Sequence, residues 1–325
     1  MKKYILLIGL AYFKVFIASG QDPFFSQFFV SPMTINPALI GNDLVKSTRV
    51  QSNARNQWWG GTSLPYSTKT IQIERRLNSR NSENNEIVLG LMFLNERSNG
   101  GILSNTFFSG AVNVKKKLDE KGNSIISGAL SCSYNNRMID LSNATFQSQF
   151  GSFGFIRTAS NYDPISTFNL NSKYIDFNAG LNYEKKSQKF DFNIGGTLFH
   201  VGKPDEGFAP NGKYPIDFRK VITSSIKYRS EKNKEVEFLA NFQNQNKSSL
   251  LTYGTTYSLI FDEIKGSKLT YGLFHRVNES IYPYVGIKYN GMNLGFSYDI
   301  ITGSAKTSFN TVQSFELSLG YVFGN

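Results

Sequence analysis

The chain has 325 residues, enough for one large barrel or two ordinary domains. Aromatic residues make up 14% of it and charged residues only 18%, with abundant Asn, Ser, Thr and Gly. This composition favours strands and turns over the helices of an ordinary soluble enzyme. The mean hydropathy of −0.29 excludes a helical membrane protein.

Residues 1–20 have the features of a secretory signal peptide. Lys2 and Lys3 form a positive start, the run up to residue 18 is mostly apolar, and small residues end at Gly20. A transmembrane anchor is the competing interpretation, but the run is too short for about twenty apolar residues, and Lys14 interrupts it. We therefore predict export through the Sec pathway, with cleavage near Gly20.

The net charge limits the classes of partner, and the cysteine count limits the classes of fold. The formal net charge is +11, and it falls to +8 when the three lysines of the predicted signal peptide are removed. A basic balance suits nucleic acid, anionic lipid headgroups or an acidic protein, and export argues against nucleic acid. Because Cys132 is the single cysteine, no intramolecular disulfide can form. A disulfide-stapled fold is excluded, and no nucleic-acid partner is predicted.

Residues 21–43 differ from the rest of the mature chain. The segment is rich in aromatic residues and proline: Pro23, Phe24, Phe25, Phe28, Phe29, Pro32 and Pro37. The prolines argue against a strand, and the rings are too apolar for a free linker. If the strands that follow close into a barrel, we expect the segment to bury its rings in the periplasmic mouth, in the lumen or against a partner.

From residue 44 onward the dominant pattern is the alternation of apolar and polar side chains that is typical of strands. It predicts about 14 strands, at 44–57, 65–77, 86–96, 104–117, 123–135, 172–184, 189–201, 218–229, 234–244, 250–260, 267–276, 281–289, 292–300 and 315–323. No segment after residue 20 has eighteen consecutive apolar residues, so no transmembrane helix is predicted in the mature chain.

The alternation is clearest near the end of the chain. One face of the last strand carries Phe315, Leu317, Leu319, Tyr321 and Phe323, and the other carries Ser314, Glu316, Ser318 and Gly320. Asn290-Gly291 separates the two strands before it, and this pair is the one that a tight hairpin prefers.

The connections between the predicted strands are asymmetric. Those on one side are short, at 78–85, 118–122, 185–188, 230–233, 261–266 and 290–291, whereas the other side includes 136–171 and 202–217. Outer-membrane barrels have an even strand number, short periplasmic turns and longer extracellular loops. Because lipid offers the backbone no hydrogen bonds, such a sheet must close. We predict an all-β fold: a transmembrane antiparallel β-barrel of about 14 strands over residues 44–325, preceded by a short non-strand N-terminal segment.

No catalytic, cofactor or metal motif is recognisable. His200 and His275 lie near predicted strand ends without the spacing of metal ligands, and a lumen or interface position explains them more simply. There is no nucleophile elbow, phosphate loop or dinucleotide fingerprint. Trp58 and Trp59 form either a binding platform or, more simply, part of an interface girdle. We predict that the protein is not an enzyme and has no cofactor.

Ordered blocks across essentially the whole mature chain resemble the PorP/SprF family, which belongs to the type IX secretion system of Bacteroidota. The blocks are Gln21 to Phe28 with Pro32, Asn36-Pro37-Ala38 and Gly41; Arg55-Asn56-Gln57-Trp58 with Pro65-Tyr66-Ser67-Thr68; Gly100 to Thr106; His200 with Pro204 and Phe208; and Gly272 to Arg276, Pro283 to Ile287, Gly295 to Ile300 and Phe315 to Leu319. Two positions depart from the pattern: Phe28, where the family often has Tyr, and Trp59, where it often has Pro.

The resemblance implies a non-enzymatic outer-membrane component that supports secretion or surface anchoring of a partner adhesin, including gliding adhesins. The implied partners are outer-membrane lipid, type IX secretion components and a secreted adhesin with a C-terminal sorting domain. We predict partner contacts at nine positions: Asp22, Pro23, Phe25, Gln27, Asn36, Pro37, Arg55, Gln57 and Trp58.

Two other functions stay open at this point. A porin-like or hydrophobic-solute channel is the alternative, because about 14 strands can enclose a lumen and a net positive charge favours anions. A soluble β-rich surface enzyme is a third possibility, and it would fold without detergent.

Overall fold

The computed structural model describes residues 22–59, 65–77, 85–141, 144–152, 154–156, 158–160, 170–208, 213–230, 233–303 and 313–324. The predicted signal peptide, residues 1–20, lies outside these ranges. The helices within them are five 3-10 turns, η1 (Phe28–Val30), η2 (Pro32–Thr34), η3 (Pro37–Leu39), η4 (Asn99–Gly101) and η5 (Gln147–Gln149). None of these described helices is long and apolar enough to cross a membrane.

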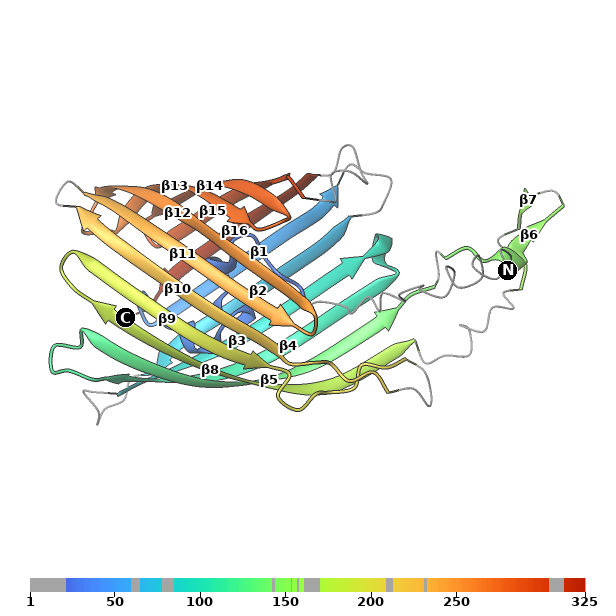
Figure 1. The fold of residues 1–325 in the computed structure, drawn as a ribbon, viewed down its shortest axis with the longest axis horizontal. Helices are drawn as coiled ribbons and strands as arrows, with labels where there is room; N and C mark the ends of the chain where they lie inside the picture. The colour runs from blue at the N-terminus through green and yellow to red at the C-terminus, as the bar shows by residue number, and fades with distance from the viewer. Residues whose placement is uncertain are drawn as a thin grey trace, which may run out of the picture.

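Within the described ranges, fourteen antiparallel strands close into one barrel (Figure 1). They are β1 (Thr48–Trp59), β2 (Tyr66–Leu77), β3 (Asn85–Ser98), β4 (Leu103–Lys117), β5 (Ser124–Ile139), β8 (Asn171–Lys186), β9 (Phe190–Phe199), β10 (Arg219–Ser230), β11 (Lys234–Gln245), β12 (Ser248–Asp262), β13 (Ser267–Arg276), β14 (Ser280–Tyr289), β15 (Met292–Ile301) and β16 (Gln313–Phe323). Each predicted strand corresponds to one of these, so the predicted fold class is confirmed.

The first strand begins at Thr48 rather than at residue 44. Leu44 is buried, and its carbonyl accepts a hydrogen bond from Arg76 Nη2 at 2.8 Å. The residues between Leu44 and Thr48 therefore connect the lumen to the wall, and the carbonyl of Ser47 accepts a hydrogen bond from the N–H of Arg76 on β2 at 2.8 Å.

Closure comes from the pairing of the first and last strands. β1 pairs with β16, from Thr48 opposite Phe323 to Asn56 opposite Phe315. β5 pairs with β8 across the longest connection, which contains a small hairpin of β6 (Phe150–Gly151) and β7 (Gly154–Phe155) that projects beyond the barrel (Figure 1). A closed sheet leaves no unpaired edge, as a sheet in lipid requires.

Side chains alternate between the two faces of the wall as the sequence predicts. On β16, Leu317 and Leu319 are exposed on the outside, while Glu316 and Ser318 are buried on the inside. Leu130, in the middle of β5, is 70% exposed. A shift of one residue in register would exchange the two faces, so the apolar pattern strongly specifies the register.

The two ends of the barrel differ. One end, here termed the turn end, carries the start of β1, the end of β16 and six connections of which the longest is residues 78–84. The other, the loop end, carries the two longest connections, residues 140–170 and 200–218, beside short ones such as 246–247 and 277–279. At the turn end, Asn290 and Gly291 have φ of 47° and 83°, the positive values that a type I′ hairpin requires. Because outer-membrane barrels keep their short turns in the periplasm, we expect the turn end to face the periplasm.

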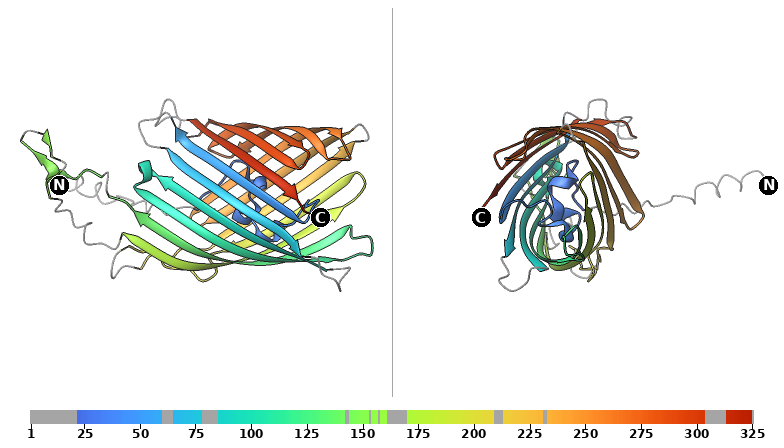
Figure 2. Two further views of the ribbon diagram at one scale, coloured as in Figure 1. Left: turned by 180° about the vertical axis from the view of Figure 1, so that it is seen from behind. Right: turned by 90° about the vertical axis from the view of Figure 1, so that its left-hand side faces the viewer.

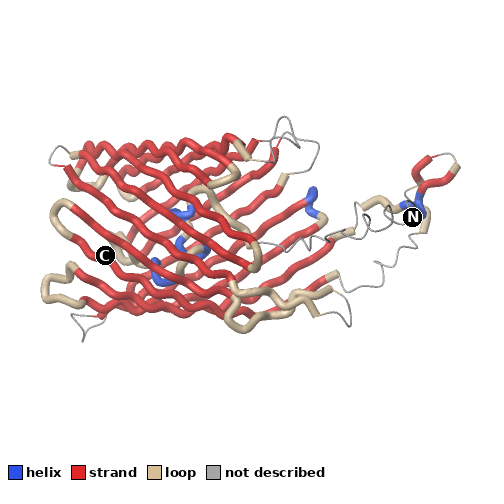
Figure 3. Tube along the Cα trace, in the orientation of Figure 1, coloured by secondary structure: helices blue, strands red, loops and turns tan. Residues whose placement is uncertain are grey.

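Residues 22–43, here termed the plug, lie inside the barrel (Figures 2 and 3). Pro32 and Pro37 start two of its three 3-10 turns, where a residue without an N–H and with a fixed φ is well suited. Apolar side chains then attach the plug to two regions of the wall. Phe25, Met33 and Ile40 pack on Val88, Met92, Leu94 and Ala111, and Phe28 and Ile35 pack on Phe199, Val221, Leu239, Phe274 and Tyr282. Each fully buried large apolar side chain stabilises this arrangement by about 1.5–3 kcal/mol.

Candidate functional site

The plug crosses the lumen from one end to the other. Asp22 lies beside His200, which directly follows β9 at the loop end. Asp43 lies beside Lys186 and Lys227, whose strands end at the opposite, turn end. The chain therefore runs through the lumen from the loop end to the turn end before it enters the wall.

At the loop end, the imidazole of His200 lies between two carboxylates. Its Nε2 is 2.8 Å from Asp22 Oδ2, and its Nδ1 is 2.9 Å from Asp176 Oδ2. Arg219 Nε is 3.0 Å from the same oxygen of Asp22, and Arg219 Nη2 donates to the carbonyl of Thr34 at 3.0 Å. The start of the plug and the η2 turn are thus held by one cluster of charged side chains.

The charged groups of this cluster stabilise one another's ionised forms. Burial by itself lowers the pKa of His200, but Asp22 and Asp176 outweigh burial and raise that pKa to about 10. Burial also opposes ionisation of Asp22, yet His200 and Arg219 hold its pKa well below the usual range. At neutral pH the imidazole is therefore protonated, and both of its nitrogens donate to carboxylates.

Further along, Ser26 and Gln27 dock on two carboxylates of the wall. The backbone N–H groups of Ser26 and Gln27 donate to Glu316 Oε2 and Oε1 at 2.6 and 2.9 Å. Ser26 Oγ donates to Asp299 Oδ1 at 2.8 Å, and Gln27 Nε2 donates to the carbonyl of Glu316 at 3.0 Å. The adjacent strands β15 and β16 thereby recognise the backbone of the plug as well as its side chains.

Two arginines balance these carboxylates. Arg55 Nη2 and Arg276 Nη1 each lie 3.0 Å from Asp299 Oδ2, and both guanidinium groups contact the ring of Phe24, with Cζ 4.5 and 4.8 Å from its centroid. Arg55, Arg276, Asp299 and Glu316 are buried. Because an unpaired buried charge is costly, this cluster ties the plug to β1, β13, β15 and β16.

Asn36 lies directly against the backbone of the wall. Its Oδ1 accepts from the N–H of Ala38 at 2.9 Å, and its Nδ2 donates to the carbonyl of Leu181 on β8 at 3.0 Å. A Cβ atom at Gly180 would lie 2.2 Å from Asn36 Oδ1, and one at Gly195 would lie 2.6 Å from Nδ2. Two wall glycines therefore leave the space that the Asn36-Pro37-Ala38 block occupies.

The end of the plug is held by its backbone. Asn113 Nδ2 donates to the carbonyls of Ala38 and Ile40 at 3.0 and 2.9 Å. The N–H of Gly41 donates to Glu74 Oε2 at 2.8 Å. Polar groups on β2 and β4 thus satisfy the buried backbone where the plug leaves the lumen.

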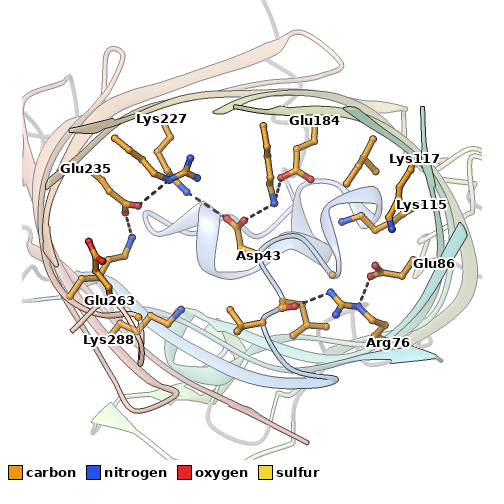
Figure 4. A pocket seen from close by; sticks show the side chains of 18 of the residues that line it. Asp43, Arg76, Glu86, Lys115, Lys117, Glu184, Lys227, Glu235, Glu263 and Lys288 are labelled. Atoms are coloured by element: carbon orange, nitrogen blue, oxygen red, sulfur yellow. Dashed lines mark hydrogen bonds and ion pairs between the residues drawn. The ribbon is translucent and has the colours of Figure 1, made fainter. Parts of the chain in front are cut away.

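Beyond the plug, a cavity of about 940 Å³ lies at the turn end, here termed the turn-end cavity (Figure 4). Its described lining includes eight cationic side chains, Arg76, Lys115, Lys117, Lys186, Lys227, Arg229, Lys268 and Lys288, and five acidic ones, Asp43, Glu86, Glu184, Glu235 and Glu263. Asp43 lies between Lys186 and Lys227, at 3.2 and 3.6 Å. The neighbouring lysines hold the pKa of Asp43 well below its usual range.

The structure places most of the nine predicted partner-contact residues at the interface between plug and wall. Asp22, Pro23, Phe25, Gln27, Asn36 and Pro37 belong to the plug, and Arg55 meets it from β1. Gln57 and Trp58 lie apart from them, at the loop-end terminus of β1. There the Trp58 ring meets Tyr66 edge-on at 5.2 Å, and the backbone N–H of Trp58 donates to Ser314 Oγ at 3.1 Å. These contacts are intramolecular, and contact with a partner stays a prediction.

Several wall residues that hold the plug were not among the predicted site residues: Asp176, Arg219, Arg276, Asp299 and Glu316. For Asp176, Asp299 and Glu316 the sequence contains a signal, which is a charged side chain at an inward position between outward apolar ones, as for Glu316 beside Leu317. Arg219 and Arg276 lack it, because Lys220 and His275 are their neighbours. Among the described residues, no group of three or more His, Cys, Asp or Glu side chains could hold a metal ion.

The fold and the segment inside the lumen define a class of protein, an outer-membrane β-barrel that holds its own N-terminal segment in the lumen. The family model described as type IX secretion system membrane protein PorP/SprF matches residues 17–321. The chain therefore belongs to this family, and the resemblance predicted from the sequence blocks is confirmed. Family and fold are those of outer-membrane secretion barrels rather than of enzymes. No similar sequence was found among the curated proteins.

Solved structures share the architecture at very low sequence identity. The TodX monoaromatic hydrocarbon channel deltaS2 mutant has a TM-score of 0.50 at 6% identity, with 90% of this chain and 92% of that chain covered. The Pseudomonas putida toluene transporter TodX has a TM-score of 0.49 at 7% identity, covering 89% and 91%. Omp33 from Acinetobacter baumannii has 0.42 at 10% identity, covering 86% and 99%. The similarity to the deltaS2 mutant concerns the barrel fold alone.

Proposed function

We propose that this type IX barrel supports the secretion and surface anchoring of a particular adhesin, with gliding adhesins among the candidates. Family membership supports a role in type IX secretion. The observation that carries the proposal is the plug, which buried ion pairs and two apolar clusters hold across the lumen. A lumen filled by its own chain suits a protein that holds a partner better than one that conducts solutes.

The loop end offers a surface for such a partner. On the projecting β6–β7 hairpin, Phe150 and Phe155 are 63% and 40% exposed, and Ile156 beside them is 49% exposed. Apolar side chains gathered on an exposed segment are typical of protein-interaction sites. They support contact with the adhesin outside the membrane.

Deleting the gene tests the proposal. We expect surface display of one adhesin to be lost, measured by antibody binding to intact cells, while other type IX cargo still reaches the surface. Complementation with the wild type should restore display. Complementation with Phe150→Ser/Phe155→Ser should restore the inserted, heat-shifted barrel but little display. Normal display of all type IX cargo in the deletion strain would contradict the proposal.

A channel for small or hydrophobic solutes is the second candidate. The cavities within the lumen and the barrel fold shared with the TodX channel mutant favour it. Single-channel recording of the purified protein in planar bilayers separates the two functions. We expect a silent barrel, and a robust open conductance would favour the channel.

A further inference from the structure

We propose that the turn-end cavity binds an acidic peptide segment presented from the periplasm. The inference rests on the proposed function in one respect, namely that a type IX partner approaches the barrel from the periplasmic side. The cavity is distinct from the contacts that hold the plug against the middle of the wall. Its charges, its floor and the closed wall around it each limit the chemical class of ligand that it can bind.

The charged side chains that line the cavity do not balance. Among the described lining residues, cationic side chains outnumber acidic ones, eight to five. Several of the cations are already paired, for example Lys268 with Glu235 at 2.7 Å and Arg76 with Glu86 at 2.7 Å.

Two lysines of the cavity are not compensated in this way. Lys115 Nζ donates to an uncharged oxygen, Asn42 Oδ1, at 2.6 Å, and none of the described carboxylates lies within ion-pair distance of it. Of the described carboxylates, none lies within ion-pair distance of Lys288, which is labelled with Lys115 at the same cavity in Figure 4. Two ammonium groups that form no direct ion pair with a described carboxylate, in a cavity with low-dielectric walls, focus a positive potential there. The cavity therefore attracts anions.

The floor of the cavity continues into two smaller spaces. Deeper spaces of about 300 and 190 Å³ lie between the plug and the wall and share Asp43 and Lys227 with the turn-end cavity. Phe29 and Leu239 line both spaces. Polar side chains interrupt these apolar ones: Asn193, Ser224, Thr256, Thr270 and Asn293. A ligand that fills the cavity needs anionic, apolar and hydrogen-bonding groups together.

The lining of the cavity suits a peptide better than a lipid. A fatty acid needs one cation and a continuous apolar tunnel, and its way in from the bilayer would cross the closed wall. Here the sheet is closed and the floor alternates apolar and polar groups. A peptide carries carboxylates for the lysines, an apolar side chain for Phe29, and backbone groups for the amides and hydroxyls. Pockets that enclose ligands have volumes of about 300–1,000 Å³, and the volume of the turn-end cavity lies in this range. It therefore suits a short peptide segment.

The test uses the purified full mature chain in detergent and a short fluorescent peptide containing Glu and Phe, followed by fluorescence anisotropy. The comparison peptide has Gln in place of each Glu. We expect the acidic peptide to bind about tenfold more tightly or better, equivalent to about 1.4 kcal/mol. Binding should weaken between about 0.1 and 1 M salt, since the screening length falls from about 10 to 3 Å. Equal binding of the two peptides would overturn the proposal.

Matched variants locate the binding site. Lys288→Glu reverses a charge in the cavity, and Lys247→Glu makes the same change at the exposed loop end. We expect only Lys288→Glu to weaken binding of the acidic peptide, by about tenfold or more. Lys288→Gln repeats the comparison if Lys288→Glu does not give a heat-shifted barrel.

Three results would overturn the proposal: an equal loss with Lys247→Glu, no loss with either Lys288 variant, or full displacement of the peptide by oleate. The outcome is independent of adhesin display. If peptide binding fails while the deletion strain still loses one adhesin, the proposed function stands and only this ligand is withdrawn.

Discussion

At the scale of single residues, the plug depends on wall positions where a side chain would leave it no space. Gly180 on β8 is the clearest, because an added Cβ would lie 2.2 Å from Asn36 Oδ1 and 3.2 Å from Pro37 Cδ. We expect Gly180→Ala to lower the free energy of unfolding by about 1–3 kcal/mol, the usual cost of overpacking. Urea unfolding of the barrel in lipid vesicles measures this change.

Gly128→Ala on β5 is the control, since its nearest neighbour, Leu181 Cδ2, would be at an ordinary 3.6 Å. Asn36→Ala should relieve part of the Gly180→Ala effect, because it removes the clashing atoms, so the two changes should not be additive. Equal stability of Gly180→Ala and Gly128→Ala would refute the docking geometry.

The pair of His200 and Asp22 predicts a pH dependence of plug attachment. The pKa of His200 is raised from 6.5 to about 10, so its contribution to stability is complete below pH 6.5 and is lost as the pH rises towards 10. The pKa of Asp22 is lowered from 3.8, so its contribution is lost as the pH falls below that value. Between these limits the charged pair holds the start of the plug.

We expect His200→Gln to destabilise the protein by about 1.5–3 kcal/mol near pH 6, the range for hydrogen bonds to charged groups. The difference from wild type should shrink as the pH approaches 10. His275→Gln, on the outer face of β13 beside the Tyr253 hydroxyl, should change stability by less than about 0.5 kcal/mol. Unfolding curves across this pH range measure the difference in free energy of unfolding between His200→Gln and the wild type. A difference that stays constant with pH would argue against a charged His200.

At the scale of elements, β1, β13, β15 and β16 share one buried ionic cluster, so a change in one strand should loosen the plug. Asp299 is 3% exposed and faces the guanidinium groups of both Arg55 and Arg276. We expect Asp299→Asn to cost about 3–5 kcal/mol, because it leaves buried positive charge uncompensated. Hydrogen exchange at Ser26 and Gln27 should accelerate in this variant.

The control for this change is Asp217→Asn. Asp217 pairs with Lys203 at 3.4 Å, and both side chains are nearly half exposed. An exposed pair of this kind contributes about 0–1 kcal/mol. If Asp299→Asn proves no more disruptive than Asp217→Asn, the cluster is not what holds the plug.

At the scale of the whole molecule, the turn end should face the periplasm. In a Cys132→Ser background, which removes the exposed thiol on β5, Lys247→Cys tests the loop end and Lys265→Cys tests the turn end. We expect a membrane-impermeant maleimide to label Lys247→Cys on intact cells, and Lys265→Cys only after the outer membrane is permeabilised. The opposite pattern would place the turn-end cavity at the cell surface.

The sequence alone determined the wall of this barrel. Alternation along each strand predicts which side chains face lipid and which face the lumen. Because strands that pair in a meander follow one another in the chain, local patterns also predict nearly all of the strand pairs. Asn290-Gly291 even specified its turn, because positive φ at both positions suits these residues. The family blocks were readable for the same reason, since they too are local.

Only the tertiary structure decided where the plug lies and what the charged residues do. The sequence left the periplasmic mouth, the lumen and a partner open for residues 21–43, because the plug binds through pairs such as Ser26 with Glu316, which are far apart in the chain. The turn-end cavity likewise gathers Arg76 of β2, Lys227 of β10 and Lys288 of β14. These charged side chains come close together only when the sheet closes, and no local sequence pattern predicts that proximity.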